Sequence, residues 1–292
     1  MRSNIKRKFN DMFRKKTIGQ IIVFTIAFLI FTLYAFTLLY AVGWAVLASL
    51  RPRQDLLNYP FSFPSRIVFS NYAQAFKGMQ VKGVGMLLMI INSIWYSVGG
   101  TFLNVACATT LAYVVSKYKF FGRKVIYTVA VVVMVLPIIG SLPATYKLIR
   151  TLNLHNSPLI LLTFTNGFGF NFIVLYGFFS NVSWSYAEAG LIDGANDFTI
   201  FNRIMLPQAI PAVLSLFIIA FIGVWNDYQG PLLYLENMPT LSVGIYLYQE
   251  ETQHNPHILY AAIVLSMLPV VILFVCFQET IMTNTVAGGL KG

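Results

Sequence analysis

Polar and aromatic side chains interrupt otherwise apolar segments of the chain. The run Trp225-Asn226-Asp227-Tyr228 places an amide and a carboxylate between two aromatic rings, late in a long apolar stretch. Amides and carboxylates hydrogen-bond ligand hydroxyl groups, and aromatic rings cover apolar ligand faces, so these residue types suit reversible binding. A carboxylate at that depth is costly unless it faces water, a partner or a ligand. The candidates for contact with a ligand are Asn92, Trp95, Trp225, Asn226, Asp227 and Tyr228.

Each of these residues also has a structural interpretation. Trp and Tyr near helix ends commonly form an interfacial belt, and Asn within an apolar helix often bonds a neighbouring helix. His155, His254 and His257 are too widely separated to indicate a metal or catalytic site, and no Gly-x4-Gly-Lys-Ser/Thr nucleotide-binding loop occurs. Cys107 and Cys276 fall in apolar runs and are interpreted as small core residues. The sequence predicts no catalytic residue, metal or cofactor of its own.

A polar loop, residues 181–207, is the second candidate site. Four charged residues at the bilayer centre would together cost about 10 kcal/mol or more, so the loop is expected in water or in protein. Ser185-Tyr186-Ala187-Glu188 has the pattern of a capping box that starts a short helix, and Gly194 is placed to end it. Asn196 or Asp197 is placed to cap a second helix, and Pro207 is expected near the first turn of the next membrane helix.

The two short helices are predicted to share an apolar surface. Ala187, Leu191 and Ala195 recur at helical spacing on the first, and Phe198, Phe201 and Met205 do so on the second. Such a surface must be covered, either by helices of this chain or by another protein. A capping-box glutamate needs no partner, but the surface favours a second protein.

The elements around these sites are predicted to be membrane helices. Hydrophobic residues make up 57% of the chain and charged residues only 10%, far below the roughly 25% of soluble domains. The net charge of +10 forms no nucleic-acid-binding face, because the cations gather at the ends of apolar runs. A crossing helix needs about 20 apolar residues, and six runs meet this length: Thr17–Leu50, Val84–Ser116, Lys124–Tyr146, Pro158–Phe179, Gln208–Leu233 and Ile258–Phe277.

Lysine and arginine counts predict the orientation. A cytoplasmic N-terminus places 13 of the 20 Lys and Arg residues on the cytoplasmic side, in agreement with the positive-inside rule. Both termini and the 181–207 loop are then cytoplasmic. The predicted organisation is a basic cytoplasmic N-terminus (1–16), a six-helix transmembrane domain (17–278) and a cytoplasmic C-terminal tail (279–292).

The loop resembles the cytoplasmic EAA loop of ATP-binding cassette (ABC) importer permeases, whose coupling helices dock into ATPase subunits. Glu188, Ala189, Gly194, Ile204, Leu206 and Pro207 fit its Glu-Ala-Ala, Gly and Ile-x-Leu-Pro pattern, with nine residues between Gly194 and Ile204. Gly190 departs from the pattern, because the second Ala is usual there. The residues that the resemblance assigns to ATPase coupling are Glu188, Ala189, Gly190, Asp193, Gly194, Ala195, Phe198, Phe201, Leu206 and Pro207.

Motifs elsewhere are similar to the carbohydrate-uptake branch of that family. They are Phe69-Ser70-Asn71-Tyr72, Asn92-Ser93, the stretch from Ala112-Tyr113 to Arg123, and Trp225-Asn226-Asp227-Tyr228. The C-terminal Val286–Gly292 is similar to the tail of the second permease subunit of maltose-type importers, which reaches between the ATPases. This implies a tail contact through Gly288, Gly289, Leu290 and Lys291.

The resemblance implies an all-α integral membrane protein, a type I ABC importer permease in a bacterial cell membrane. Its implied partners are a second permease subunit, two ATPase subunits that bind ATP and Mg²⁺, an extracytoplasmic solute-binding protein and a carbohydrate. Closure of the ATPases would switch the path from inward-facing to outward-facing. The rival interpretations are an autonomous secondary transporter or channel, although the sequence shows no convincing inverted repeat, and an intramembrane protease, although it shows no paired catalytic residues.

Overall fold

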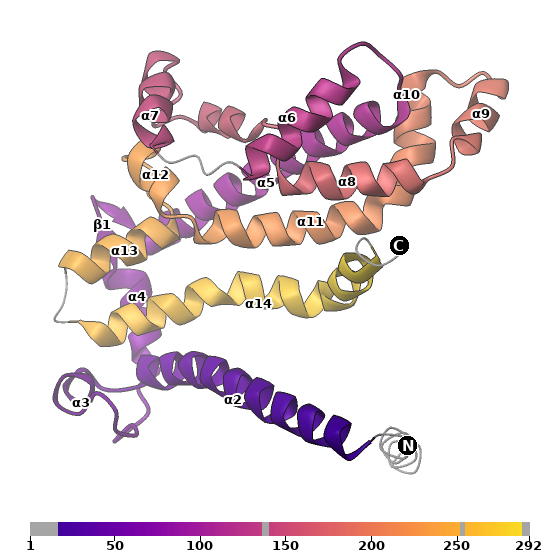
Figure 1. Cartoon of the computed structure of the whole chain (residues 1–292). Helices are drawn as coiled ribbons and strands as arrows, with labels where there is room; N and C mark the ends of the chain where they lie inside the picture. Colours follow the sequence, from indigo (N-terminus) through magenta and orange to yellow (C-terminus); the bar gives the residue numbers. More distant parts are fainter. Residues whose placement is uncertain (1–16, 136–139, 252–254, 288–292) are drawn as a thin grey trace.

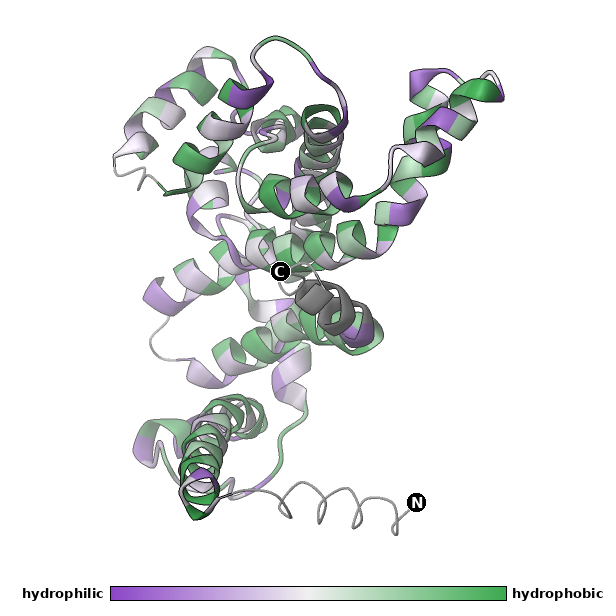
Figure 2. Ribbon diagram, turned by 45° about the vertical axis from the view of Figure 1, so that its right-hand side comes forward, coloured by the Kyte–Doolittle hydropathy of each residue, from purple (hydrophilic) through white to green (hydrophobic). Residues whose placement is uncertain are grey.

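The computed structural model describes residues 17–135, 140–251 and 255–287. In these ranges the chain is helical apart from a small antiparallel hairpin, β1 (Gln80–Val81) with β2 (Val84–Gly85). Four helices are long and apolar enough to cross a membrane, and they span Ile18–Ser49, Met86–Lys117, Asp197–Asn226 and Pro256–Glu279. Figure 2 shows that these long helices are mostly hydrophobic, whereas hydrophilic residues gather at their ends and connections.

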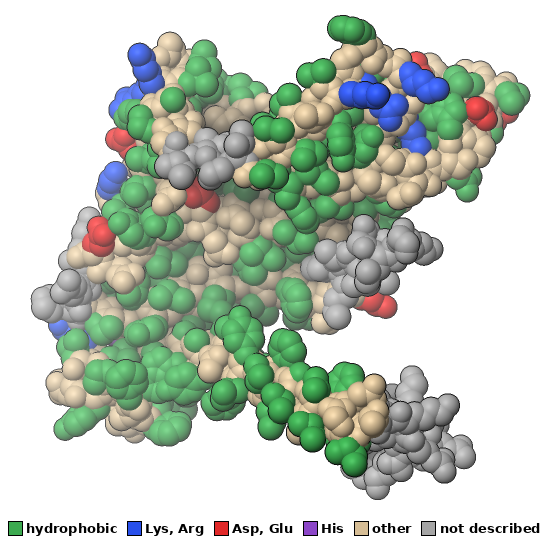
Figure 3. Space-filling view, in the orientation of Figure 1, with side chains coloured by type: hydrophobic (Ala, Val, Ile, Leu, Met, Phe, Trp, Pro, Cys, Tyr) green, Lys and Arg blue, Asp and Glu red, His purple; other side chains and the backbone are tan. Residues whose placement is uncertain are grey.

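The first long helix, α2 (Ile18–Ser49), is apolar on every side and exposes nearly all of its side chains. Only its last turn is buried, at Ala48 and Ser49. It contacts the last helix, α14 (Pro256–Ala287), and Figure 3 shows hydrophobic side chains along its length. A helix that is hydrophobic all round is stable in lipid or inside a larger protein assembly.

At the end of α2 the chain folds around a buried arginine. Arg51 donates through Nη1 to the Pro60 carbonyl at 2.8 Å and through Nη2 to the Tyr59 carbonyl at 2.7 Å. These bonds hold the loop that contains α3 (Arg53–Asn58), and α4 (Ser70–Gly78) then leads to the β-hairpin. The connection is therefore an ordered structure and not a plain link between two membrane helices.

The second long helix, α5 (Met86–Lys117), lies at the centre of the fold. It packs against α8 (Phe170–Asn181) and α11 (Leu206–Asn226) along much of its length. Its buried residues include many small ones, such as Ala108 and Ala112, which let the neighbouring helices approach closely.

The third and fourth predicted crossings differ from single continuous helices. The 124–146 segment is divided into α6 (Arg123–Val135) and α7 (Ser141–Thr151), and Gly140 has a left-handed φ of +85° before α7. The 158–179 segment is divided into a 3₁₀ helix, η1 (Pro158–Phe164), and α8, with Gly169 at φ +117° between them. At 1.5 Å per residue α8 alone is about 18 Å long, shorter than the hydrocarbon layer. Six crossings therefore stay a prediction.

The fifth predicted crossing ends earlier than expected, because α11 ends at Asn226 and a separate helix, α12 (Gln229–Tyr234), follows. Helix α13 (Leu241–Glu251) lies in a stretch that the sequence suggested was a loop. The last helix is longer than the predicted 258–277 at both ends. The start of α2, the end of α14 and the 181–207 loop all lie at one end of the molecule, as the predicted topology requires (Figure 1).

Three buried clusters hold these helices together. One joins α5, α8 and α11 to the loop, and it contains Ala112, Phe179, Ala187 and Met205. A second, around Met89 and Trp225, joins α5, α11, α13 and α14. A third, around Tyr96, joins α5 to η1 and α7. The loop thus shares a hydrophobic core with the membrane helices.

Candidate functional site

The 181–207 loop forms a projecting helical arm at one end of the molecule (Figure 1). Helix α9 (Ser185–Ile192) ends in a tight turn in which the Gly194 N–H donates to the Leu191 carbonyl and the Ala195 N–H to the Gly190 carbonyl, at 3.0 and 2.9 Å. This pair of bonds is a Schellman motif, which needs the left-handed φ of +80° at Gly194. The predicted role of Gly194 as a helix terminator is confirmed.

The second half of the loop runs into a membrane helix without a break. The Asn196 side chain accepts from the Thr199 N–H at 2.8 Å and caps α10 (Asp197–Thr199), as predicted. A π-helical segment, η2 (Ile200–Met205), then continues into α11, and the helix bends there (Figure 1). Pro207 lacks an N–H and crowds the preceding turn, and a wider turn relieves that crowding. The expected second short helix is thus the end of the Asp197–Asn226 helix.

The predicted capping box is wrong. The N-cap of α9 is Trp184, so Ser185 already lies in the first helical turn, and its N–H donates to Ser183 Oγ at 3.3 Å. Within the described residues the exposed carboxylate of Glu188 accepts no hydrogen bond from the backbone. Local helix capping therefore does not account for Glu188.

The predicted apolar surface of the loop is divided between two environments. Ala187 and Met205 are fully buried in this chain's own core, and the Phe201 ring lies 4.8 Å from the ring of Tyr113 on α5. Gly190 faces the same way, because a Cβ atom added there would lie 2.6 Å from Ile204 Cδ1. The chain itself covers this half of the surface, whereas the sequence favoured cover by a second protein.

The other half forms an exposed tip, which we define as Leu191, Ile192 and Phe198. Their exposures are 49%, 86% and 76%. Glu188 lies one turn before Ile192 on the same stripe of α9, and Figure 3 shows hydrophobic and acidic side chains at this end.

The sequence analysis missed Ile192, although its place four residues after Glu188 is a usable signal. Of the residues assigned to coupling, Glu188, Ala189, Asp193, Gly194, Phe198 and Pro207 are exposed, Ala195, Phe201 and Leu206 are half-buried and Gly190 is buried.

Side chains at the end of α5 fasten the arm to the membrane helices. The Tyr118 hydroxyl donates to Asp197 Oδ1 at 2.8 Å, and its ring packs edge-on against Trp184 at 5.9 Å. Lys117 Nζ donates to the Val182 carbonyl. Burial raises the pKa of the Tyr118 hydroxyl above its ordinary value, and hydrogen bonds with Tyr113 and Asp197 act in the same direction. Tyr118 therefore stays a neutral donor.

The ligand-contact candidates separate into two places. Asn226 and Tyr228 line a cleft of about 340 Å³ together with Tyr246 and Gln249 of α13. The Tyr228 and Tyr246 rings stack with centroids 4.7 Å apart. Sequence reasoning missed Tyr246 and Gln249, because it placed no helix at 241–251. Stacked rings beside amide groups suit a ligand with apolar faces and hydroxyl groups.

Trp225 is mainly structural although it also lines this cleft. Its side chain is buried, and Nε1 donates to the Ser266 carbonyl of α14 at 3.0 Å. On α5, Asn92 donates to the Pro239 carbonyl at 3.1 Å and Trp95 donates to Asn92 Oδ1 at 3.3 Å. Asn92 and Trp95 therefore fasten the 235–240 connection and do not line the cleft.

Asp227 was expected within an apolar helix, and this is wrong because the residue lies in the break between α11 and α12. Its Oδ1 accepts from the backbone N–H groups of Gln229 and Gly230 at 3.0 and 3.2 Å. Its carbonyl accepts from Ser242 Oγ at 2.8 Å. The two bonds to Oδ1 offset the cost of placing a carboxylate here, so the position alone does not require a ligand.

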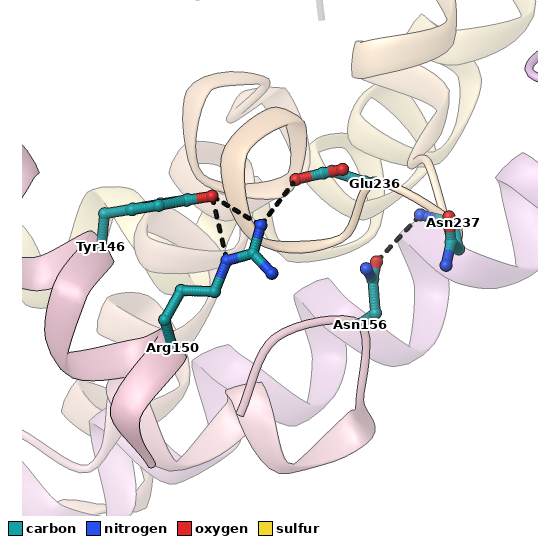
Figure 4. A network of polar contacts seen from close by, with 5 residues as sticks. All are labelled: Tyr146, Arg150, Asn156, Glu236 and Asn237. Atoms are coloured by element: carbon teal, nitrogen blue, oxygen red, sulfur yellow. Dashed lines mark hydrogen bonds and ion pairs between the residues drawn. The ribbon is translucent and has the colours of Figure 1, made fainter. Parts of the chain in front are cut away.

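A polar network holds α7 against the connection after α12 (Figure 4). Arg150 donates to the Tyr146 hydroxyl at 2.8 Å and approaches Glu236 at 3.8 Å, and the Asn237 N–H donates to Asn156 Oδ1 at 2.9 Å. Among the described residues no cluster of metal-binding side chains occurs. The predicted tail contact, Gly288–Lys291, lies outside the described residues.

Comparison with known proteins decides the family. Residues 104–283, well over half of the chain, match the model of the binding-protein-dependent transport system inner membrane component. The chain belongs to this family. It is therefore a membrane-embedded permease component of ABC transporters, and the matched range contains both the helical arm and the Tyr228 cleft.

The chain matches several permease proteins over most of its own length and most of theirs. The chain is 29% identical to the sulfoquinovosyl glycerol transport system permease protein of Agrobacterium fabrum, over 87% of this chain and 89% of the relative. It is 28% identical to the diacetylchitobiose uptake system permease protein of Streptomyces coelicolor, over 85% and 82%. The maltose/maltodextrin transport system permease protein of Vibrio vulnificus is 29% identical, over 71% and 73%. The predicted resemblance to sugar ABC importer permeases is thereby confirmed.

A solved structure shares the fold. It is a chain of a bacterial ABC transporter involved in the import of the acidic polysaccharide alginate, with a TM-score of 0.75 and 23% identity, and the match covers 90% of this chain and 98% of that one. The described part of the chain thus has the helical fold of an ABC importer permease.

Proposed function

We propose that this permease forms, with a second permease subunit, the translocation path for a carbohydrate in an ATP-driven importer of a bacterial cell membrane. Two ATPase subunits bind ATP and Mg²⁺ and dock on the helical arm, and an extracytoplasmic solute-binding protein delivers the sugar. The arm and both chain termini lie in the cytoplasm. The observation that supports the proposal best is that the arm exposes an apolar tip while its base shares a core with α5, α8 and α11.

This arrangement suits the transmission of force. A partner that grips Ile192 and Phe198 pushes on α9 and α10. Ala187 of α9 and Met205 of η2, which follows α10 directly, are held in the shared core. The continuous path from α10 through η2 to α11 carries displacement into a membrane helix. Closure of the ATPases would therefore reorient α11 together with α5 and α8, and so change the access to the path.

The Tyr228 cleft is the part of the path that this chain contributes. The Tyr228 and Tyr246 rings cover C–H faces of a sugar, and Asn226 and Gln249 hydrogen-bond its hydroxyl groups. The relatives named above carry chemically different sugars. Variation among the cleft residues and in the binding protein then accounts for substrate choice.

The test is a reconstituted transporter that contains this permease, the second permease and the ATPase. The double variant Ile192→Ser/Phe198→Ser should assemble with the second permease but lose most of its ATPase association and transport, because an apolar tip is replaced by hydroxyls. Tyr186→Ser is the matched control, since Tyr186 is 53% exposed on another side of α9. Equal ATPase binding by the double variant and the control would contradict the docking site. Transport by the permease alone, without ATPase, would contradict the whole proposal and favour a secondary transporter.

A further inference from the structure

A cationic cleft separates α6 from α8, away from both the arm tip and the Tyr228 cleft. It has a volume of about 520 Å³ and is lined by Arg123, Lys124, Tyr127, Thr128 and Tyr176. We propose that this cleft binds the phosphate headgroup of an anionic membrane lipid. This inference goes beyond the transport function and concerns the lipid that surrounds the permease.

The cations of the cleft are not neutralised by protein. Arg123 donates through Nη2 to the Ser116 carbonyl at 3.0 Å, and in the described part of the chain no carboxylate pairs with Arg123 or Lys124. Lys124 is exposed and Arg123 is half-buried. Two adjacent cations with spare donors attract a phosphate strongly at a membrane surface, and Arg matches phosphate geometry particularly well.

Backbone and hydroxyl groups add to the site. Arg123 and Lys124 form the first turn of α6, a helix of 13 residues, so its positive end faces the same place as the two side chains. Thr128, Tyr127 and Tyr176, each of which carries a hydroxyl group, belong to the lining, and the two tyrosine rings lie 4.6 Å apart. Hydroxyl donors suit the glycerol and ester oxygens that follow a lipid phosphate.

The surface next to the cleft indicates a lipid and not a soluble phosphate. On the side of the cleft, helix α6 exposes Met134 and Val135, at 50% and 75%. They follow Tyr127 and Thr128 by seven residues, about two helical turns, and so continue the cleft side of α6 as an apolar stripe. A cationic end followed by an apolar stripe matches a phospholipid headgroup followed by its acyl chains. Figure 3 shows Lys and Arg side chains gathered over this end of the molecule, beside hydrophobic ones.

The test measures lipid binding to the complete transporter in a neutral detergent. Dioleoyl phosphatidylglycerol is titrated and its retention is followed by native mass spectrometry, with dioleoyl phosphatidylcholine and inorganic phosphate as comparison ligands. Arg123→Gln/Lys124→Gln should lower the affinity for phosphatidylglycerol about 30-fold, as expected from about 1 kcal/mol for each cation near the surface. The control Lys77→Gln/Lys147→Gln makes the same charge change at two exposed lysines elsewhere and should leave it unchanged.

A second variant separates lipid from free phosphate. Met134→Ser/Val135→Ser should weaken phosphatidylglycerol binding while leaving any inorganic phosphate binding unaffected. If Arg123→Gln/Lys124→Gln fails to assemble, Lys124→Gln alone is used, because the Lys124 side chain is exposed. Equal retention of phosphatidylglycerol by parent and variants would overturn the proposal. Failure of the parent transporter to retain any phosphatidylglycerol would overturn it too. Competition by inorganic phosphate at equal strength would overturn it in favour of a soluble anion.

Discussion

Gly194 offers the sharpest test of the arm, because its replacement affects the backbone and nothing else. A Cβ atom there meets no other atom within 4 Å, so a larger side chain causes no clash. The left-handed φ of +80° is nevertheless unfavourable for an L residue, by about 1 to 2 kcal/mol, and most for a β-branched one. Gly194→Val should therefore open the Schellman turn about 5-fold to 30-fold more often. Gly194→Asn should behave almost as the parent, because Asn tolerates this conformation.

Two measurements on the reconstituted transporter follow the effect. Hydrogen exchange at the amides of residues 194 and 195, whose N–H groups close the turn, should speed up in Gly194→Val by the same factor, about 5-fold to 30-fold. Transport for each ATP hydrolysed should fall, since a loose turn no longer fixes α9 relative to α10. If Gly194→Val has the same hydrogen-exchange rate and the same transport for each ATP as Gly194→Asn, the role assigned to the turn is refuted. A loss in both variants alike would point to side-chain volume at a docking surface instead.

Asp227→Asn should retain assembly and transport, because an amide oxygen still accepts from the Gln229 and Gly230 N–H groups. Asp227→Leu should destabilise α12 by about 0.5 to 2 kcal/mol, and faster hydrogen exchange in α12 would detect this loss. Tyr118→Phe should lose the bond to Asp197, worth about 1 kcal/mol, and should speed exchange in α10 without affecting membrane insertion. Tyr246→Ala should raise the substrate concentration for half-maximal transport with little change in ATPase association, because it removes one stacked ring, and an unchanged value would remove the cleft from the path. A cysteine at Ser185 should react with an impermeant thiol reagent only from the cytoplasmic side and one at Lys82 only from outside; the reverse would invert the proposed topology.

Apolar length in the sequence predicted the long helices well. Helices α2, α5 and α14 coincide with predicted spans to within a few residues at their first ends, because a run of about 20 apolar residues has few structures open to it besides a membrane helix. Whether an apolar run forms one continuous helix was harder to predict. Gly140 and Gly169 divide two apolar runs, and an apolar run looks the same whether it forms one helix or a 3₁₀ turn, a bend and a second helix.

In the loop, local rules predicted the turns but not the environments. Gly194 and Asn196 act as the sequence indicated, since their roles depend on a few neighbouring residues. The positions of α5 and α8 decide which side chains are buried. They place Ala187 and Met205 in the core and leave Ile192 and Phe198 at the surface. Helical spacing alone predicts a shared face but does not indicate which part of that face the same chain covers.

Gly190 shows why the arm works as one body and not as a flexible loop. An alanine there would bring its Cβ to 2.6 Å from Ile204 Cδ1, so the glycine lets α9 lie unusually close to η2. Helix α9 therefore packs directly on η2, and η2 continues into α11. In the proposed mechanism, a partner's push on Ile192 displaces the end of α11, because the alternative is to separate α9 from η2 and expose Ala187 and Ile200 to water. The departure from the usual alanine thus stiffens the connection between the exposed tip and the membrane helix, although glycine lowers the helix propensity of α9 itself.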